Sequence, residues 1–339
     1  MCGEHKYDGA LELELADVSM ASIDTLMLLA LLAAIFVAMA GLLGGRFVNL
    51  YNFQSLMFSA PELGLLALAM MLSMLPGGID LSLVAIANLA AVLAALFFRH
   101  LAPSLGVLVA QLSFVAVLLG VVLALIVGAL CGALNGFLIT RLRVTPILAT
   151  IGTSQLFFGA SLVITGGPAI QGFPSGWTAI GNDTVSGIPV PMLVMAAVYL
   201  VMMLLLRRTS PGVSLTLIGT NARAARFSGV RSRAIVFGAF VLCGVIASGA
   251  GILISARTNA AKADYGSSYL LVSVLVAVLG GTNPSGGRAT VIGVAAALCA
   301  LTLLSSGFQM LRFSNFLVEL IWGAFLLVVL SLQFLRTRF

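Results

Sequence analysis

Residues 192–206 read MLVMAAVYLVMMLLL, an apolar run that ends at Arg207 and Arg208. The run shows no alternation of apolar and polar residues, so it is typical of a helix in hydrocarbon and not of a strand in a lipid-facing barrel. Similar runs recur along the 339-residue chain, which is 61% hydrophobic and 8% charged and has a mean hydropathy of +1.17. Soluble domains carry about 25% charged residues. The composition therefore predicts an all-α, polytopic membrane protein and argues against a soluble enzyme or a nucleic-acid binder.

The apolar runs predict about ten transmembrane helices, because one span needs about 20 residues. The run 106–139 is too long for one upright span, so we expect it to be tilted, extended beyond the bilayer or broken. The ten expected spans are 25–44, 60–75, 82–98, 106–139, 147–165, 191–206, 234–255, 268–280, 289–306 and 316–334.

Charge divides the chain into two regions and orients it. Residues 1–23 are rich in Asp and Glu and are expected to form an acidic cytoplasmic tail, while 24–339 form the transmembrane domain. Ten spans with the amino terminus inside place most of the 17 lysines and arginines in the cytoplasm, as membrane proteins prefer. Both termini are then cytoplasmic. The net charge of +6 follows from this topology and does not require a nucleic-acid partner.

No cofactor site is expected in this chain. Its 4 cysteines and 2 histidines show no metal-ligand spacing, so a metal site is not predicted. Neither Lys6 nor Lys262 follows a glycine-rich, phosphate-binding loop. If ATP drives the protein, the nucleotide must bind to another polypeptide.

Asp80 is the carboxylate most suggestive of function, because a charge at membrane depth is costly. Gly77 and Gly78 precede it and would break the span, so that a new helix begins near Asp80. One interpretation places Asp80 in a substrate pathway, and the other makes it the N-cap of a helix starting near Leu81. Further polar residues in apolar runs could line the same pathway or bond neighbouring helices: Ser82, Asn88, Asn135, Ser154 and Gln155.

Two local patterns indicate structural roles. Residues 59–62 (SAPE) have the form of a capping box, which predicts a helix start with Ser59 as N-cap and Glu62 reaching back. Small residues every four positions let two helices approach closely. This spacing predicts a packing face at Gly128, Gly132 and Gly136.

The most basic loop, 207–233, contains a candidate interaction element. Thr220 or Asn221 can cap a short helix from Ala222 to Ser228, which Gly229 can end in the left-handed conformation. Its small and basic residues suit a groove on a partner protein. The alternative is a basic anchor on anionic lipid.

Three motifs together resemble one transporter family. Residues 77–82 read GGIDLS, residues 219–230 read GTNARAARFSGV, and residues 278–282 read VLGGT before the glycine pair 286–287. Over residues 45–335, this order is similar to that of permeases from ribose/xylose-type ABC importers. The pair of GG motifs also forms a possible internal echo, as repeats are common in transporters.

The resemblance implies a type II importer architecture in a bacterial inner membrane. A second permease subunit, identical or related, would complete the pore, and a cytoplasmic ABC ATPase would bind Mg-ATP. A periplasmic or lipid-anchored binding protein would deliver a monosaccharide or related sugar-like solute to the outer loop 166–190, where Phe173, Trp177 and Asp183 are the expected docking residues. The ATPase would bind a coupling segment that contains Gly219, Asn221, Arg223, Ala225, Arg226, Ser228 and Gly229.

One departure from the family pattern leaves the substrate open. Many of these sugar permeases carry acidic residues just before the late motif, where residues 269–273 read YLLVS. The branch that handles autoinducer-2 is similar in this respect. An ion-driven secondary transporter would need several buried carboxylates along an ion path, and only Asp80 is a candidate. A membrane enzyme would need a cluster of catalytic side chains, which the sequence does not indicate.

Overall fold

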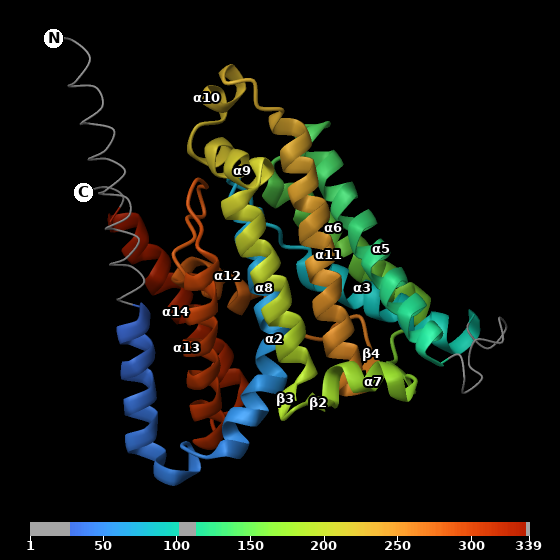
Figure 1. Cartoon of the computed structure of the whole chain (residues 1–339), viewed down its shortest axis with the longest axis vertical. Helices are drawn as coiled ribbons and strands as arrows, with labels where there is room; N and C mark the ends of the chain where they lie inside the picture. Colours follow the sequence, from blue (N-terminus) through green and yellow to red (C-terminus); the bar gives the residue numbers. More distant parts are fainter. Residues whose placement is uncertain (1–27, 102–112, 337–339) are drawn as a thin grey trace.

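The computed structural model describes residues 28–101 and 113–336 of an α-helical protein (Figure 1). The predicted acidic tail 1–23 and the first part of the run 106–139 lie outside these residues. In the described part, eight helices are long and apolar enough to cross a membrane, and Tyr269–Leu279 and Asn315–Ser331 are shorter apolar helices. Each expected span coincides with one of these helices, which confirms the all-α, polytopic fold.

The elements follow one another with short connections. A helix over residues 28–43 continues into the 3-10 helix η1 (Gly44–Arg46). The remaining helices are α2 (Leu50–Met74), α3 (Leu83–Leu96) with the π-helical η2 (Phe97–Leu101), α5 (Ser113–Thr140), α6 (Pro146–Thr165), α7 (Ser175–Asn182), α8 (Val190–Arg208), α9 (Ser210–Thr220), α10 (Ala222–Phe227), α11 (Ser232–Thr258), α12 (Tyr269–Leu279), α13 (Val291–Met310) and α14 (Asn315–Arg336). The strands are β1 (Ile170–Gln171), β2 (Thr184–Val185), β3 (Ile188–Pro189) and β4 (Ala260–Ala261).

The two ends of the helix bundle differ (Figure 1). At one end, called here the α10 end, lie α9, α10 and the loop 280–290. At the other, the α7 end, lie α7 and the four short strands. Ile170 pairs with Ala261 and Gln171 with Ala260 in an antiparallel ladder, which joins β1 to β4 across a long sequence interval. β2 and β3 form a hairpin.

Helix α2 lies at the centre of the bundle and packs against α8, α11, α12 and α13. Its residues from Pro61 to Met74 are all buried. The helix starts at Leu50, where the Asn49 side chain accepts a hydrogen bond from Tyr51 N at 3.1 Å. The predicted start at Ser59 is therefore wrong. Ser59 lies inside the helix and its hydroxyl donates to Ser55 O at 3.1 Å.

Glu62 is part of a buried ion pair and not of a capping box. Its Oε1 lies 2.6 Å from Nε of Arg257 in α11, and Glu62 is only 2% exposed. Nη2 of Arg257 donates to Oε2 at 3.1 Å, and the Tyr269 hydroxyl donates to the same oxygen at 3.3 Å. A buried charge is tolerated when it is paired and hydrogen-bonded. The pair thus joins α2 to α11 and to the start of α12.

Glycines bring α5 and α11 into backbone contact. A Cβ at Gly132 would collide with Phe240 O, and one at Gly128 would collide with Gly244 O. Gly136 faces Phe237 in the same way. The three glycines of the predicted packing face thus lie at one helix–helix contact.

The described part of the long fourth run is an unbroken helix, Ser113–Thr140.

The first prediction tests this contact. Gly→Ala in a helix normally stabilises by about 0.5–1 kcal/mol, because alanine has less freedom to lose. Gly132→Ala instead places a methyl group against Phe240 O, so we expect a lower Tm for the purified full chain and an overpacking cost of about 1–3 kcal/mol. Gly152→Ala is the matched control, since an added Cβ there has no atom within 4 Å. An equal Tm for both variants would contradict the close approach.

Candidate functional site

The short helix α10 is built by its own end signals. Oδ1 of Asn221 accepts hydrogen bonds from Arg223 N and Ala224 N, both at 3.0 Å, so Asn221 is the N-cap. At the other end Ser228 N bonds to Ala224 O, and Gly229 has a φ of 80°. Such a left-handed residue ends a helix at least cost when it is glycine. The sequence therefore predicted α10 to within one residue.

Helix α10 protrudes from its end of the bundle and offers charge and an aromatic ring (Figure 1). Phe227 is 93% exposed, and Arg223 and Arg226 are exposed on the same short helix. Ala225 is fully buried and anchors the helix to the bundle. An exposed phenyl ring beside two guanidinium groups on one short helix suits a partner surface that is both apolar and acidic.

Gly219, in the last turn of α9, lies at a junction against the backbone of two other segments. A Cβ at Gly219 would collide with Leu75 O and with Gly287 N. These two atoms are themselves hydrogen-bonded, Gly287 N donating to Leu75 O at 3.0 Å. Gly77 and Gly286 close the junction, since a Cβ at Gly286 would lie 2.8 Å from Gly77 N. Gly77 of the first GG motif therefore contacts Gly286, which follows the Gly280–Gly281 pair of the predicted echo, and both glycines lie beside the end of α9.

Asp80 is the centre of a buried hydrogen-bond network. Its Oδ1 accepts from Ser82 N at 2.9 Å and from Ser82 Oγ at 2.6 Å. Nδ2 of Asn135 lies 2.7 Å from Ser82 Oγ and 3.4 Å from Asp80 Oδ2. Thr153 Oγ1 then donates to Asn135 Oδ1 at 2.6 Å. The network joins α5 and α6 to the start of α3, and Asp80, Ser82 and Asn135 are fully buried.

Other predicted pathway residues lie apart from this network. Nδ2 of Asn88 donates to Ala263 O at 2.7 Å and to Tyr265 O at 2.9 Å, so it holds the loop before α12. Gln155 is exposed on α6 and Ser154 is half-buried. The α6 side chains that reach the Asp80 region are Thr150 and Thr153, which the sequence analysis missed. Thr150 Oγ1 accepts from Leu81 N at 3.1 Å and donates to Ile79 O at 3.2 Å.

The outer-loop aromatics are core residues, which corrects their predicted docking role. Phe173 is 8% exposed and Trp177 is fully buried. Their rings stack with centroids 5.5 Å apart, and Phe98 packs edge-on against Trp177 at 5.1 Å. Nε1 of Trp177 donates to Ser255 Oγ at 3.2 Å. The amphipathic α7 turns Trp177 inward, so only Asp183 of the three predicted residues is exposed.

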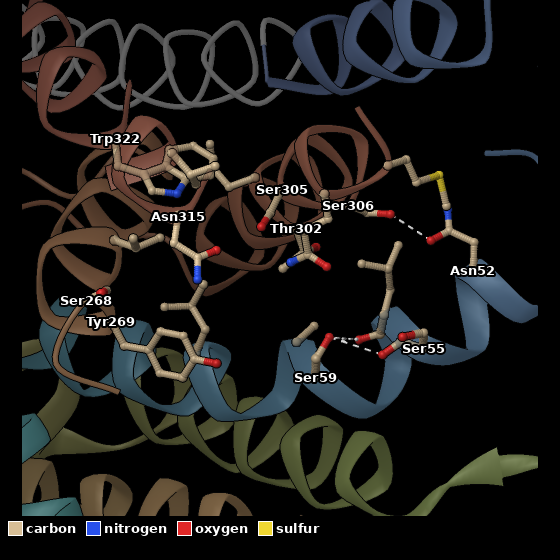
Figure 2. Close-up of a pocket in the computed structure, with 18 of the residues that line it drawn as sticks. Asn52, Ser55, Ser59, Ser268, Tyr269, Thr302, Ser305, Ser306, Asn315 and Trp322 are labelled. Atoms are coloured by element: carbon tan, nitrogen blue, oxygen red, sulfur yellow. Dashed lines mark hydrogen bonds between the residues drawn. The ribbon is translucent and has the colours of Figure 1, made fainter. Parts of the chain in front are cut away.

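A cavity of about 700 Å³, lined by both polar and apolar side chains, lies between α2, α12, α13 and α14 (Figure 2). It takes in the first half of α2 and the second half of α13, so it lies toward the α7 end. The sequence analysis missed it because single serines and threonines are unremarkable in an apolar helix. Polar side chains around it include Asn52, Ser55, Ser59, Ser268, Thr302, Ser305, Ser306, Gln309, Asn315 and Glu319.

Within residues 28–101 and 113–336, no three His, Cys, Asp or Glu side chains are grouped so that they could hold a metal ion. The arrangement offers polar surfaces and a protruding helix in place of a reactive centre.

Comparison with protein families agrees with these features. Residues 52–330 match the family described as the permease component of branched-chain amino acid transport systems. The chain belongs to this family. The matched residues include all three sequence motifs, both GG loops and α10. The protein is therefore a multi-pass membrane permease related to the sugar-type ABC importers that its motifs indicated.

Curated relatives of the permease are about equally similar to it. The autoinducer 2 import system permease protein LsrD of Yersinia enterocolitica is 31% identical over 307 residues, covering 88% of this chain and 89% of the relative. LsrD of Escherichia coli K12 is 32% identical over 310 residues, with 89% of each chain covered. LsrD of Yersinia pseudotuberculosis is 31% identical, with 88% of each chain covered. No solved structure matches the permease.

The second prediction concerns Asp80. Both of its carboxylate oxygens accept from donors, so either rotamer of Asp80→Asn puts an NH2 group against another donor. An unsatisfied buried group costs about 1–3 kcal/mol, so we expect a lower Tm for the purified permease. Asp183→Asn, at an exposed position, is the control and should leave the Tm unchanged. An unaltered Tm in Asp80→Asn would remove Asp80 from its structural role.

Proposed function

We propose that this chain is the membrane-spanning subunit of an ATP-driven importer in a bacterial inner membrane. A separate cytoplasmic ABC ATPase would bind Mg-ATP and contact α10, and a second permease subunit, identical or related, would complete the pore. A periplasmic or lipid-anchored binding protein would deliver the solute. Both termini and the α10 end would face the cytoplasm.

The observation that carries the proposal is the mechanical placement of α10. The helix exposes Arg223, Arg226 and Phe227 to a partner, while Ala225 and the Gly219 junction fasten it to the bundle. No side chain separates Gly219 from Leu75 and Gly287, so a displacement of α10 that reaches the end of α9 would press on both backbone segments. An ordinary basic lipid anchor would not need this contact.

Charge supports the proposed orientation. Arg207 and Arg208 end α8, and α9 and α10 continue from it at the same end of the bundle. Arg223, Arg226 and Arg231 follow in this region. Such a concentration of arginine favours the cytoplasmic side.

The proposed cargo is a monosaccharide or a sugar-like solute such as autoinducer 2. Support comes from the names of the LsrD relatives and from the absence of acidic residues in 269–273, which the autoinducer-2 branch shares. The absence of acidic residues in 269–273 also supports a pore formed by this chain and a related, non-identical permease.

The third prediction tests the ATPase contact. The chain is co-expressed with a candidate ABC ATPase and a candidate second permease from the same organism, and the complex is purified. Arg226→Glu and Phe227→Ala should each reduce the amount of ATPase recovered with the permease. The first replaces a positive charge that would face acidic residues of the ATPase, and the second removes an aromatic ring that the ATPase would bury. Arg208→Glu is the control, since it reverses an exposed charge at the same end but outside α10. Equal loss in all three variants, the control included, would show that α10 has no special part in the contact and would contradict the assignment.

The fourth prediction tests transmission through the junction. Gly219→Ala leaves the exposed face of α10 intact but forces Leu75 O and Gly287 N apart. We expect normal ATPase recovery with strongly reduced uptake in proteoliposomes, so ATP use and transport become uncoupled. Gly152→Ala is again the matched control.

One transport experiment on the purified chain would contradict the whole proposal. If the purified chain alone accumulated solute in vesicles that hold only a proton or sodium gradient, it would be a secondary transporter, and the ATPase contact would have no role.

A further inference from the structure

Three helices turn a stripe of polar residues toward the cavity of Figure 2. In α2 the stripe is Asn52, Ser55 and Ser59, spaced so that they lie on one helix face. α13 and α14 contribute stripes with the same helical spacing. Polar residues in membrane helices normally face the protein interior or water, because lipid cannot satisfy them. The α13 and α14 stripes are Thr302, Ser305, Ser306 and Gln309, and Asn315 and Glu319.

Part of this polar lining is already used by the protein. Ser306 Oγ donates to Asn52 Oδ1 at 2.7 Å and ties α13 to α2 at one side of the cavity (Figure 2). Ser268 Oγ donates to Glu319 Oε1 at 2.6 Å and ties the loop before α12 to α14. These bonds fix the walls of the cavity.

Other lining groups keep their hydrogen-bonding capacity. Within the described residues, the side chains of Ser55, Ser305, Gln309 and Asn315 have no hydrogen-bond partner. They come from three different helices and line one space. Hydroxyl and amide groups can both donate and accept, so together they suit a ligand with many hydroxyl groups.

The apolar part of the lining is aromatic at one side. Trp322 is 6% exposed, and its ring and that of Tyr269 line the cavity with Val272 and Val318. The Tyr269 hydroxyl is held by Glu62, which fixes the ring. A sugar ring presents a C–H face and a rim of hydroxyls, so it can pack on such aromatic rings while its hydroxyls bond to the polar stripes.

We propose that this cavity is a solute-binding chamber for a neutral, polyhydroxylated molecule of monosaccharide size. The inference deepens the proposed function and rests on it. A volume of about 700 Å³ falls within the about 300–1,000 Å³ of small-molecule sites. The chamber differs from the Asp80 network, whose polar groups are buried and bonded to one another.

The composition of the lining favours a neutral, polyhydroxylated solute over a charged solute, a branched-chain amino acid or a lipid chain. Arg46 and Glu319 are opposite charges, and the remaining polar groups are neutral, so a net-charged solute has no dominant partner. The hydroxyl and amide groups on three of the walls can each bond to a hydroxyl of a sugar, whereas the side chain of a branched-chain amino acid would contact only the apolar part of the lining, such as Leu56, Leu63 and Val318. A lipid chain would leave those groups unsatisfied.

Thiol labelling tests the chamber without relying on ATP hydrolysis. The permease is placed in lipid nanodiscs with Cys2 and Cys299 replaced by alanine, while the buried Cys131 and Cys243 remain. Ser305→Cys places a thiol in the chamber. Leu320→Cys is the control, since Leu320 is 68% exposed on α14 and does not line the cavity. A charged methanethiosulfonate and an uncharged lipophilic maleimide are the two reagents.

The expected result is fast labelling of Cys at 305, but not at 320, by the charged reagent. At least one of D-ribose, D-xylose and D-galactose should slow it in a saturable way, by about tenfold at about ten times its Kd. Leucine and glycine betaine at equal concentration should not. If Ser305→Cys fails to fold, Thr302→Cys replaces it.

Several results would overturn the chamber. Labelling by the lipophilic reagent alone would mean that lipid fills the cavity. Stronger protection by leucine would indicate an amino-acid site, and equal slowing by all solutes, or by none of the sugars, would mean that no saccharide binds. Protection by a sugar in a permease that recovers no ATPase would overturn the proposed importer role and leave the chamber standing.

Discussion

The contact between Gly219, Leu75 and Gly287 is the constraint on which the functional argument depends. Three backbone segments meet there with no side chain between Gly219 and the other two segments, and one hydrogen bond, Gly287 N to Leu75 O, closes the contact. Side chains can change rotamer and absorb a small shift, but backbone in contact with backbone cannot. The junction therefore makes α10, the end of α2 and the loop 280–290 one mechanical unit, which explains why all three sequence motifs converge on it.

Features with local causes could be predicted from the sequence. The ten helices follow from hydropathy, and α10 follows from an Asn cap at 221 and a left-handed glycine at 229. The small-residue face of α5 also needs only a spacing rule, because any partner must approach closely there. In each case the free energy that sets the structure arises from residues near one another in the chain or from the bilayer itself.

Predictions failed where distant residues decide the outcome. The SAPE stretch has the local form of a helix start, but α2 already begins at Leu50, and Glu62 pairs with Arg257, which is far away in sequence. On α6 the predicted Ser154 and Gln155 directly follow Thr153, but the side chains that reach the Asp80 region are Thr153 and Thr150, because the apolar sequence on both sides hides which face is buried. Trp177 was read as an exposed loop residue, although the aromatic partners Phe98 and Phe173 enclose it.

Helix α2 connects the two functional regions. Its first half carries the polar stripe of the chamber, and Leu75, one residue beyond its end, contacts Gly219 and Gly287. The segment between is buried on all sides and held by the Glu62–Arg257 pair, so it has little room to bend. Pro61 removes one backbone hydrogen bond near the chamber, which makes that point the weakest in the helix. Under the proposed function, a push at α10 would therefore reach α2 as a displacement along its buried half, and any change of shape would concentrate near Pro61, beside the chamber wall.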